Sequence, residues 1–287
     1  MEFEALDIRL NELYPIVDKF VILESKYTHS GKEKPFYLTE NLGKYLKFID
    51  KIHIIQNFDN KSKWDSVLRN NKQRDRATEF LKELDLLPSD LLILGDVDEI
   101  PRAATIETLV KRQDVNVTLL MDLYIRKINL HFGQWNHCRV LNYKFFKSIQ
   151  ECYRDIFLRE SLPQRRFKYL PIIRMNRHFA VNFFDRNFFL ILTERQKNIK
   201  IDTVQNGGWH FTQLYDIERI KEKIDAMSHR ELAPETLDTN TLTSSIYLTY
   251  GLGNPGTIKV LDNSYPKYVL NNQNIFQDFI LNQNNVI

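Results

Sequence analysis

The chain has 287 residues, 43% of them hydrophobic, and its 40 basic and 37 acidic side chains leave a formal charge of +3. This apolar content excludes an intrinsically disordered chain and is sufficient for one domain with a sizeable core. Lysine and arginine are scattered, so nothing indicates nucleic-acid binding, and Cys138 and Cys152 lack the spacing of a zinc site or disulfide scaffold.

Helical and strand patterns alternate over residues 1–121. Strands that alternate with helices are typical of a parallel sheet with right-handed crossover connections. We therefore expect an α/β fold whose mostly parallel sheet is flanked by helices. In chain order the expected elements are a helix over residues 5–17, strands at 20–23 and 51–56, a helix at 64–87, a strand at 91–94, a helix at 105–112 and a strand at 116–121.

The pattern changes beyond residue 121, where aromatic residues become dense and turn signals irregular. We expect an antiparallel, aromatic-rich region with long loops there, within a single domain that spans residues 1–287. No apolar stretch is long enough to cross a membrane, and the acidic N-terminus does not resemble a signal peptide. A soluble protein is the resulting expectation.

The most informative segment is residues 91–101 (LLILGDVDEIP), a short apolar strand that ends in three acidic residues and a proline. Asp96, Asp98 and Glu99 are expected at the carboxyl end of a buried strand, the edge at which α/β sheets bind ligands. Carboxylates placed there can hold a hard divalent cation against a phosphate. The alternative interpretation is a solvated acidic turn, because an Asp-x-Asp sequence also occurs by chance.

A second cluster, residues 207–212 (GGWHFT), precedes an expected helix at 216–227. Its two glycines allow a sharp turn or a close approach of the backbone to another group. Taken alone, His210 is more readily interpreted as a structural histidine than as a ligand, because backbone groups commonly satisfy a ring nitrogen.

Four blocks follow one another along the chain: residues 20–31 (FVILESKYTHSG), 96–101 (DVDEIP), 208–211 (GWHF) and 265–268 (YPKY). Together they resemble the glycosyltransferases of family 17. The resemblance implies a GT-A-like, Rossmann-like fold, in which residues 1–121 bind the nucleotide sugar and residues 122–287, with C-terminal helices, bind the acceptor. It also implies an inverting transferase that moves a sugar, GlcNAc in the characterised branch, from a UDP-sugar to a saccharide hydroxyl in β linkage.

The resemblance further implies a divalent cation, Mn²⁺ or Mg²⁺, which neutralises the charge growing on the diphosphate leaving group. Asp98 is expected to hold this ion, with Asp96 close by. His210 is expected as a further ligand of the metal or of a phosphate, because GT-A enzymes often supply one from a late loop. The structural interpretation of His210 stays open beside it.

An inverting transfer also requires a general base within reach of the acceptor hydroxyl. Glu99 directly follows the acidic turn, and Glu231 lies where the family tends to have an acid. We prefer Glu231 of the two. For both, the alternative is a solvated surface glutamate without a catalytic role.

Donor binding is expected at the carboxyl ends of the first strands. Glu24 and Ser25 end the first strand, and Lys32 lies in the loop after it, to meet a phosphate or the acceptor, or else to remain a solvated lysine. Arg74 is expected to pair with the diphosphate, or Asp75 with the ribose, unless both belong to a helix surface.

The chain begins almost inside the family's opening helix, with no membrane anchor ahead of it. We therefore expect a cytoplasmic enzyme that acts on a saccharide or glycoconjugate acceptor, whose identity the loosely similar residues 122–205 leave open. Two other classes of protein fit the same motifs: a nucleotide-sugar or glycan-binding protein without transfer activity, and a phosphatase or nuclease that uses the acidic turn.

Overall fold

The computed structural model describes residues 2–28, 31–58, 66–153, 155, 200–215, 219 and 256–282. The expected helix at 216–227 lies almost wholly outside these residues, as does much of the region expected to bind the acceptor. Within the described part, no helix is both long and apolar enough to cross a membrane.

The helices and strands expected over residues 1–121 are all present, most of them with shifted ends. The helices are α1 (Phe3–Leu13), α2 (Tyr37–Glu40), α3 (Ser66–Glu83), α4 (Ala103–Val110) and α10 (Lys267–Asn271), and the 3₁₀ helices are η1 (Leu42–Phe48), η2 (Tyr143–Phe145) and η4 (Gln277–Phe279). The strands are β1 (Phe20–Ser25), β2 (Ile52–Asn57), β3 (Leu91–Leu94), β4 (Glu99–Pro101), β5 (Asn116–Ile125), β6 (Leu130–Trp135), β7 (Arg139–Asn142), β8 (Asp202–Thr212) and β9 (Thr257–Ile258). Sequence analysis missed α2 and β4.

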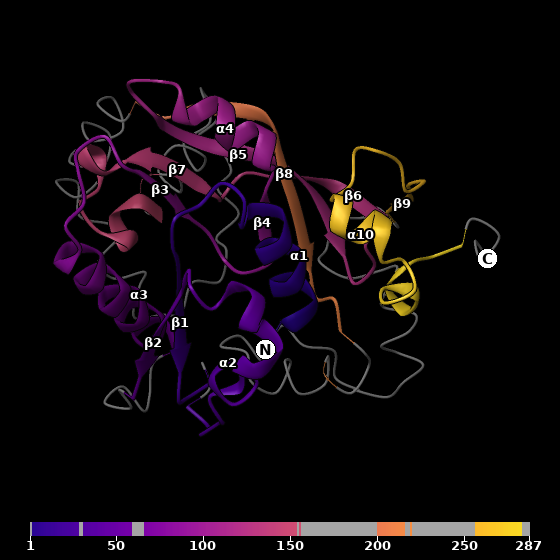
Figure 1. Ribbon diagram of the computed structural model, residues 1–287, viewed down its shortest axis with the longest axis horizontal. Coiled ribbons are helices and arrows are strands. Elements are labelled where there is room, and N and C mark those ends of the chain that lie inside the picture. The colour runs from indigo at the N-terminus through magenta and orange to yellow at the C-terminus, as the bar shows by residue number, and fades with distance from the viewer. Residues whose placement is uncertain are drawn as a thin grey trace, which may run out of the picture.

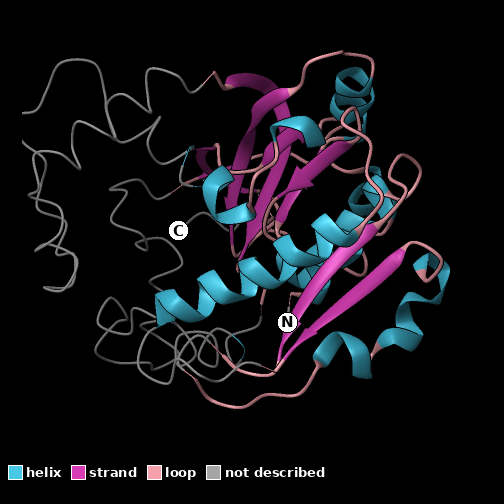
Figure 2. Cartoon of the chain, turned by 90° about the vertical axis from the view of Figure 1, so that its left-hand side faces the viewer, coloured by secondary structure: helices cyan, strands magenta, loops and turns pink. Residues whose placement is uncertain are grey.

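The expected GT-A-like, mostly parallel sheet is wrong. Strands β1 and β2 pair in parallel as a separate two-stranded sheet, whereas β3 to β9 form a seven-stranded sheet that is mostly antiparallel. In that larger sheet, β3 pairs antiparallel with β7, and the parallel pair is β5 with β8. Figure 2 shows the small sheet standing apart from the larger one.

A buried asparagine explains why β3 pairs with β7. Asn142, the last residue of β7, accepts a hydrogen bond from the backbone N–H of Val115 at 2.6 Å and donates one to the carbonyl of Ser89 at 2.7 Å. These bonds fasten β7 between the residues that lead into β5 and β3. The apolar run of β3 fits a parallel or an antiparallel neighbour equally well, so it does not itself predict this pairing.

Helix α1 connects the two main apolar cores of the described chain. Leu6, Leu10 and Leu13 are at most 1% exposed and pack in a core with β1, α4, β5 and β7. Ile8 points into a second core that contains Trp209 of β8 and side chains from the C-terminal segment. In Figure 1, α1 accordingly lies across β4, close to α10.

Strand β8 approaches β4 unusually closely at Gly208, which has a φ of +142°. A Cβ atom at this position would lie 2.1 Å from the carbonyl oxygen of Ile100 and 2.8 Å from the backbone nitrogen of Arg102. No side chain fits at that distance, and L-residues rarely adopt this φ. The pairing of β4 with β8 therefore requires glycine at position 208.

Replacing Gly208→Ala is expected to lower the free energy of unfolding by roughly 3 kcal/mol, because the new methyl group must separate the two strands. Chemical denaturation measures the change. Gly43→Ala is the matched control, because a Cβ at Gly43 meets no atom within 4 Å and should change stability by less than about 0.5 kcal/mol. Equal stability of the two variants would contradict the close approach.

Candidate active site

The acidic turn that joins β3 to β4 is closed by one of its own carboxylates. The backbone N–H of Glu99 donates to the carbonyl of Asp96 at 3.1 Å, and Glu99 Oε2 accepts from the N–H of Asp96 at 3.0 Å. A Cβ at Gly95 would lie 2.6 Å from the same Oε2. The Glu99 side chain therefore folds back over Gly95 and fixes the turn.

Glu99 is 2% exposed, and its other carboxylate oxygen is also engaged. Glu99 Oε1 accepts a hydrogen bond from Trp135 Nε1 at 2.5 Å. Burial and, next, the charge of Asp96 raise the pKa of Glu99 to about 7, against the lowering effect of the indole bond. Through these contacts the Glu99 carboxylate stabilises the turn. The role of Glu99 as a general base stays a prediction.

Asp98 meets His210 where β4 pairs with β8. The antiparallel register places Glu99 opposite His210, and His210 Nε2 lies 3.3 Å from Asp98 Oδ2. Burial lowers the pKa of His210, but the hydrogen bond to Asp98 and the neighbouring carboxylates together raise it above its ordinary value. His210 Nδ1 is buried and makes no hydrogen bond within the described structure.

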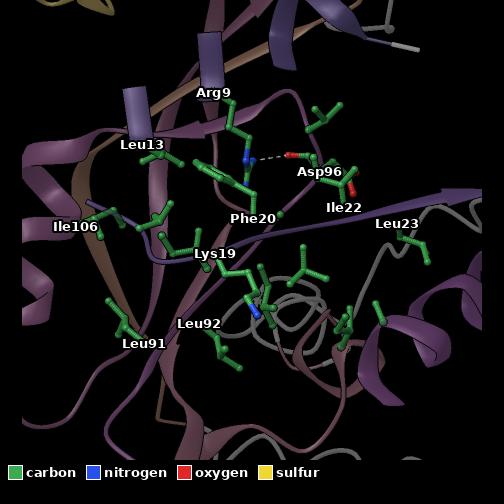
Figure 3. Close-up of a pocket in the computed structure, with 18 of the residues that line it drawn as sticks. Arg9, Leu13, Lys19, Phe20, Ile22, Leu23, Leu91, Leu92, Asp96 and Ile106 are labelled. Atoms are coloured by element: carbon green, nitrogen blue, oxygen red, sulfur yellow. Dashed lines mark hydrogen bonds between the residues drawn. The ribbon is translucent and has the colours of Figure 1, made fainter. Parts of the chain in front are cut away.

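A cavity of about 1640 Å³ lies beside the turn. Figure 3 shows its apolar wall, to which side chains of β1 and β3 contribute from strands that are not paired with each other. The cavity therefore lies between the two sheets, whose strands were expected to form one mostly parallel sheet. Around the turn, the polar lining includes Arg9, Arg74, Asp96, Asp98, Gln134, Trp135, Tyr153 and His210.

Asp96 in the turn and Arg74 on α3 both line this cavity. The Asp96 side chain is open to the space of the cavity but crowded by protein on its other sides. This desolvation and the charge of Asp98 raise the pKa of Asp96, while the charge of Arg74 lowers it. The Arg74 guanidinium lies 4.1 Å from the centre of the Tyr153 ring, a cation–π contact that holds it on the cavity wall.

Arg9 on α1 is a contact that sequence analysis missed. Its Nη1 donates to the carbonyl oxygen of Asp96 at 2.7 Å (Figure 3). The same nitrogen also donates to the carbonyl oxygen of Glu99. Three residues later, Glu12 Oε1 accepts from the backbone N–H of Ala103 at 2.9 Å, at the start of α4. No local sequence pattern predicts these contacts, because 87 residues separate Arg9 from Asp96.

The other residues expected to bind the donor do not line the cavity. Glu24 is 4% exposed, and its carboxylate accepts bonds from the backbone N–H groups of Leu38 at 2.7 Å and Thr39 at 3.2 Å, at the start of α2. Ser25 is buried and Lys32 is exposed in its loop.

Two candidates remain, Asp75 and Glu231. Asp75 is exposed on α3 and accepts a hydrogen bond from Gln150. Glu231 lies outside the described residues, so its role as a base stays a prediction.

The acidic turn offers the donor atoms that a hard divalent cation prefers. Asp98 and His210 already meet, and Asp96 presents a carboxylate to the adjacent cavity. Within the described residues, no three His, Cys, Asp or Glu side chains lie close enough together to form a complete metal site. Because Mg²⁺ is commonly held by one or two carboxylates and completed by substrate phosphates, these residues fit such an ion.

Comparison with known proteins adds independent information. Residues 1–144, half of the chain, match the profile of glycosyltransferase family 17. Human β-1,4-mannosyl-glycoprotein 4-β-N-acetylglucosaminyltransferase is 30% identical to this chain over 106 residues, which cover 35% of the chain and 20% of that protein. The rat protein of the same name gives the same values, and the mouse protein is 29% identical over 106 residues.

The matched segment thus spans about a fifth of the length of these curated relatives. No solved structure gave a significant match.

The pairing of Trp135 with Glu99 leads to a pH-dependent prediction. Folding raises the pKa of Glu99 to about 7, so between the ordinary glutamate range and about pH 7 the folded chain keeps a proton that the unfolded chain has lost. The free energy of unfolding therefore falls as the pH rises through this range. The indole N–H of Trp135 favours the ionised form of Glu99, and Trp135→Phe removes this donor. The variant is expected to lose roughly 1–3 kcal/mol more at about pH 8 than at about pH 5 in chemical denaturation.

The control for this experiment repeats the substitution in a Glu99→Gln background, where no ionisation remains and the extra loss should disappear. A loss that is the same at both pH values in the original background would show that the indole bond does not act on the Glu99 carboxylate.

Proposed function

The chain belongs to glycosyltransferase family 17, and from this premise we propose that it transfers N-acetylglucosamine from UDP-N-acetylglucosamine to a saccharide hydroxyl, with inversion at the anomeric carbon. The observation that carries the proposal is the acidic turn at the cavity. There, Asp96, Asp98, His210 and Arg74 line one cavity, and His210 Nε2 lies 3.3 Å from Asp98 Oδ2. This combination of carboxylates and a guanidinium suits a diphosphate bound together with a cation.

A divalent cation is part of the proposal, with Asp98 as its main protein ligand and Asp96 and His210 beside it. Such an ion, when bound, neutralises the negative charge that develops on a departing UDP. The protein itself supplies the positions of these groups. Asp98 is fixed through its backbone, because its carbonyl accepts a hydrogen bond from Phe211 N–H at 3.0 Å.

Arg74 has the geometry of a diphosphate-binding residue. Its guanidinium is stacked on Tyr153 and lies on the cavity wall, so little side-chain freedom remains to be lost when an anion binds. Arginine forms paired hydrogen bonds to phosphate oxygens, and its charge persists at any physiological pH.

The general base and the acceptor are the open parts of the mechanism. Glu99 is 2% exposed, does not line the cavity and accepts a hydrogen bond at each carboxylate oxygen, so an acceptor hydroxyl could reach it only if the turn rearranged. This constraint favours Glu231 as the proposed base. The acceptor is proposed to be a saccharide or glycoconjugate, in keeping with the names of the related proteins.

The first test measures transfer and hydrolysis of a panel of UDP-sugars with Mn²⁺, with Mg²⁺ and with EDTA. Asp98→Asn is expected to reduce turnover of UDP-N-acetylglucosamine by about 100-fold or more, because the amide cannot hold the cation as the carboxylate does. Asp114→Asn, at an exposed aspartate paired with Lys144, is the matched control and should leave turnover unchanged. Full turnover by a correctly folded Asp98→Asn variant would contradict the proposed role of the turn.

The second test concerns the diphosphate. Arg74→Gln is expected to raise the KM for the UDP-sugar by about 10-fold, because a charge-assisted hydrogen bond to a phosphate oxygen is lost. The control is Arg76→Gln on the same helix, where the side chain pairs with Glu79 at the protein surface. Steady-state kinetics with both variants decides the point, and an equal KM in the two would exclude Arg74 from the donor site.

A further inference from the structure

A side chain of α1 forms hydrogen bonds to the backbone of the acidic turn. We propose that Arg9 is a positioning residue, whose guanidinium joins the carbonyl oxygens of Asp96 and Glu99 and so keeps the carboxylates of Asp96 and Asp98 directed toward the cavity. The inference rests on the proposed function, in which Asp96 and Asp98 hold the cation and the donor.

The geometry of the contact supports a clamp on the backbone. Arg9 Nη1 donates to Asp96 O at 2.7 Å and also to Glu99 O, two carbonyls that mark the two ends of the turn. A single nitrogen bonded to both fixes the distance between these ends. Both bonds go to carbonyl oxygens, so Arg9 acts on the backbone of the turn and not on the carboxylates of Asp96 and Asp98.

The helix that carries Arg9 is itself firmly anchored. Leu6, Leu10 and Leu13 of α1 are at most 1% exposed. Glu12, on the same helix, accepts from Ala103 N–H at 2.9 Å just beyond β4. Helix α1 therefore contacts the chain before β4 through Arg9 and after β4 through Glu12. Precise placement of a binding group requires such a rigid supporting element.

The turn also has its own internal bonds, and these define what Arg9 adds. Glu99 closes the turn through Asp96 N–H, and β8 holds Asp98 through Phe211 N–H. The Asp96 carbonyl also accepts from Glu99 N–H at 3.1 Å, and Arg9 is the group that joins this carbonyl to the carbonyl of Glu99. Without the guanidinium, the peptide groups of Asp96 and Glu99 lose their common partner, and the turn gains freedom to rotate its carboxylates away from the cavity.

The test compares Arg9→Met, which removes the donors, with Arg9→Lys, which keeps the charge and a shorter donor. Arg76→Met is the control, because Arg76 lies on the surface of α3 and pairs with Glu79. Two readouts are used: amide hydrogen exchange of Asp96, Glu99 and Phe211, and binding of Mn²⁺ with and without UDP, followed by the electron paramagnetic resonance of free Mn²⁺.

Arg9→Met is expected to speed exchange at these amides by about 10- to 100-fold, because a charge-assisted hydrogen bond is lost. The same variant is expected to weaken Mn²⁺ binding by about 10-fold. Arg9→Lys should recover part of both effects, and Arg76→Met should match the wild type. Exchange within α1 should not change, because the apolar anchor of the helix is intact.

Wild-type exchange at the turn in Arg9→Met would overturn the proposal. So would faster exchange spread evenly over α1 and β4, since Arg9 would then stabilise the fold without positioning the turn. Failure of the proposed function gives a different result: the wild type itself would bind neither Mn²⁺ nor UDP, while the exchange data would still decide whether Arg9 holds the turn.

Discussion

The backbone of β8 lies against β4 with no room for a side chain at Gly208, and this contact sets the geometry of the candidate site. It brings His210 opposite Glu99 and places the imidazole 3.3 Å from the carboxylate of Asp98. The paired residues are more than a hundred positions apart in sequence, so the site exists only once the larger sheet has formed. A methyl group at position 208 would separate the two strands and, with them, Asp98 from His210.

Crowding three carboxylates into one turn carries an electrostatic cost, which the surrounding residues offset in different ways. Glu99 accepts a hydrogen bond from the indole of Trp135, Asp98 meets the imidazole of His210, and the charge of Arg74 lowers the pKa of Asp96. The pKa of Asp96 and that of Glu99 are nevertheless raised, so compensation is incomplete. A cation bound at the turn would complete it, which is consistent with the proposed transferase mechanism.

Sequence analysis located the elements better than it located their partners. The strand at residues 91–94 was expected from its apolar run, and β3 occupies those residues. The expected parallel sheet was wrong, because side chains such as Asn142 select the neighbouring strand through bonds to residues 27 and 53 positions away. Around the turn, Asp96, Asp98, Arg74 and His210 line one cavity, and their roles as ligands stay predictions. Glu24, Ser25 and Lys32 do not line it.

By itself, the sequence determined the order of helices and strands, the acidic turn after a buried strand, and the likeness to a transferase family. These follow from local periodicity and short motifs, which act over a few residues. The tertiary structure alone decided that β3 pairs with β7 and that the Glu99 side chain folds inward to close the turn. It also decided that Arg9 donates hydrogen bonds to the carbonyl oxygens of the turn. Such contacts depend on hydrogen bonds and close packing between distant segments, and no local pattern of polar and apolar residues encodes them.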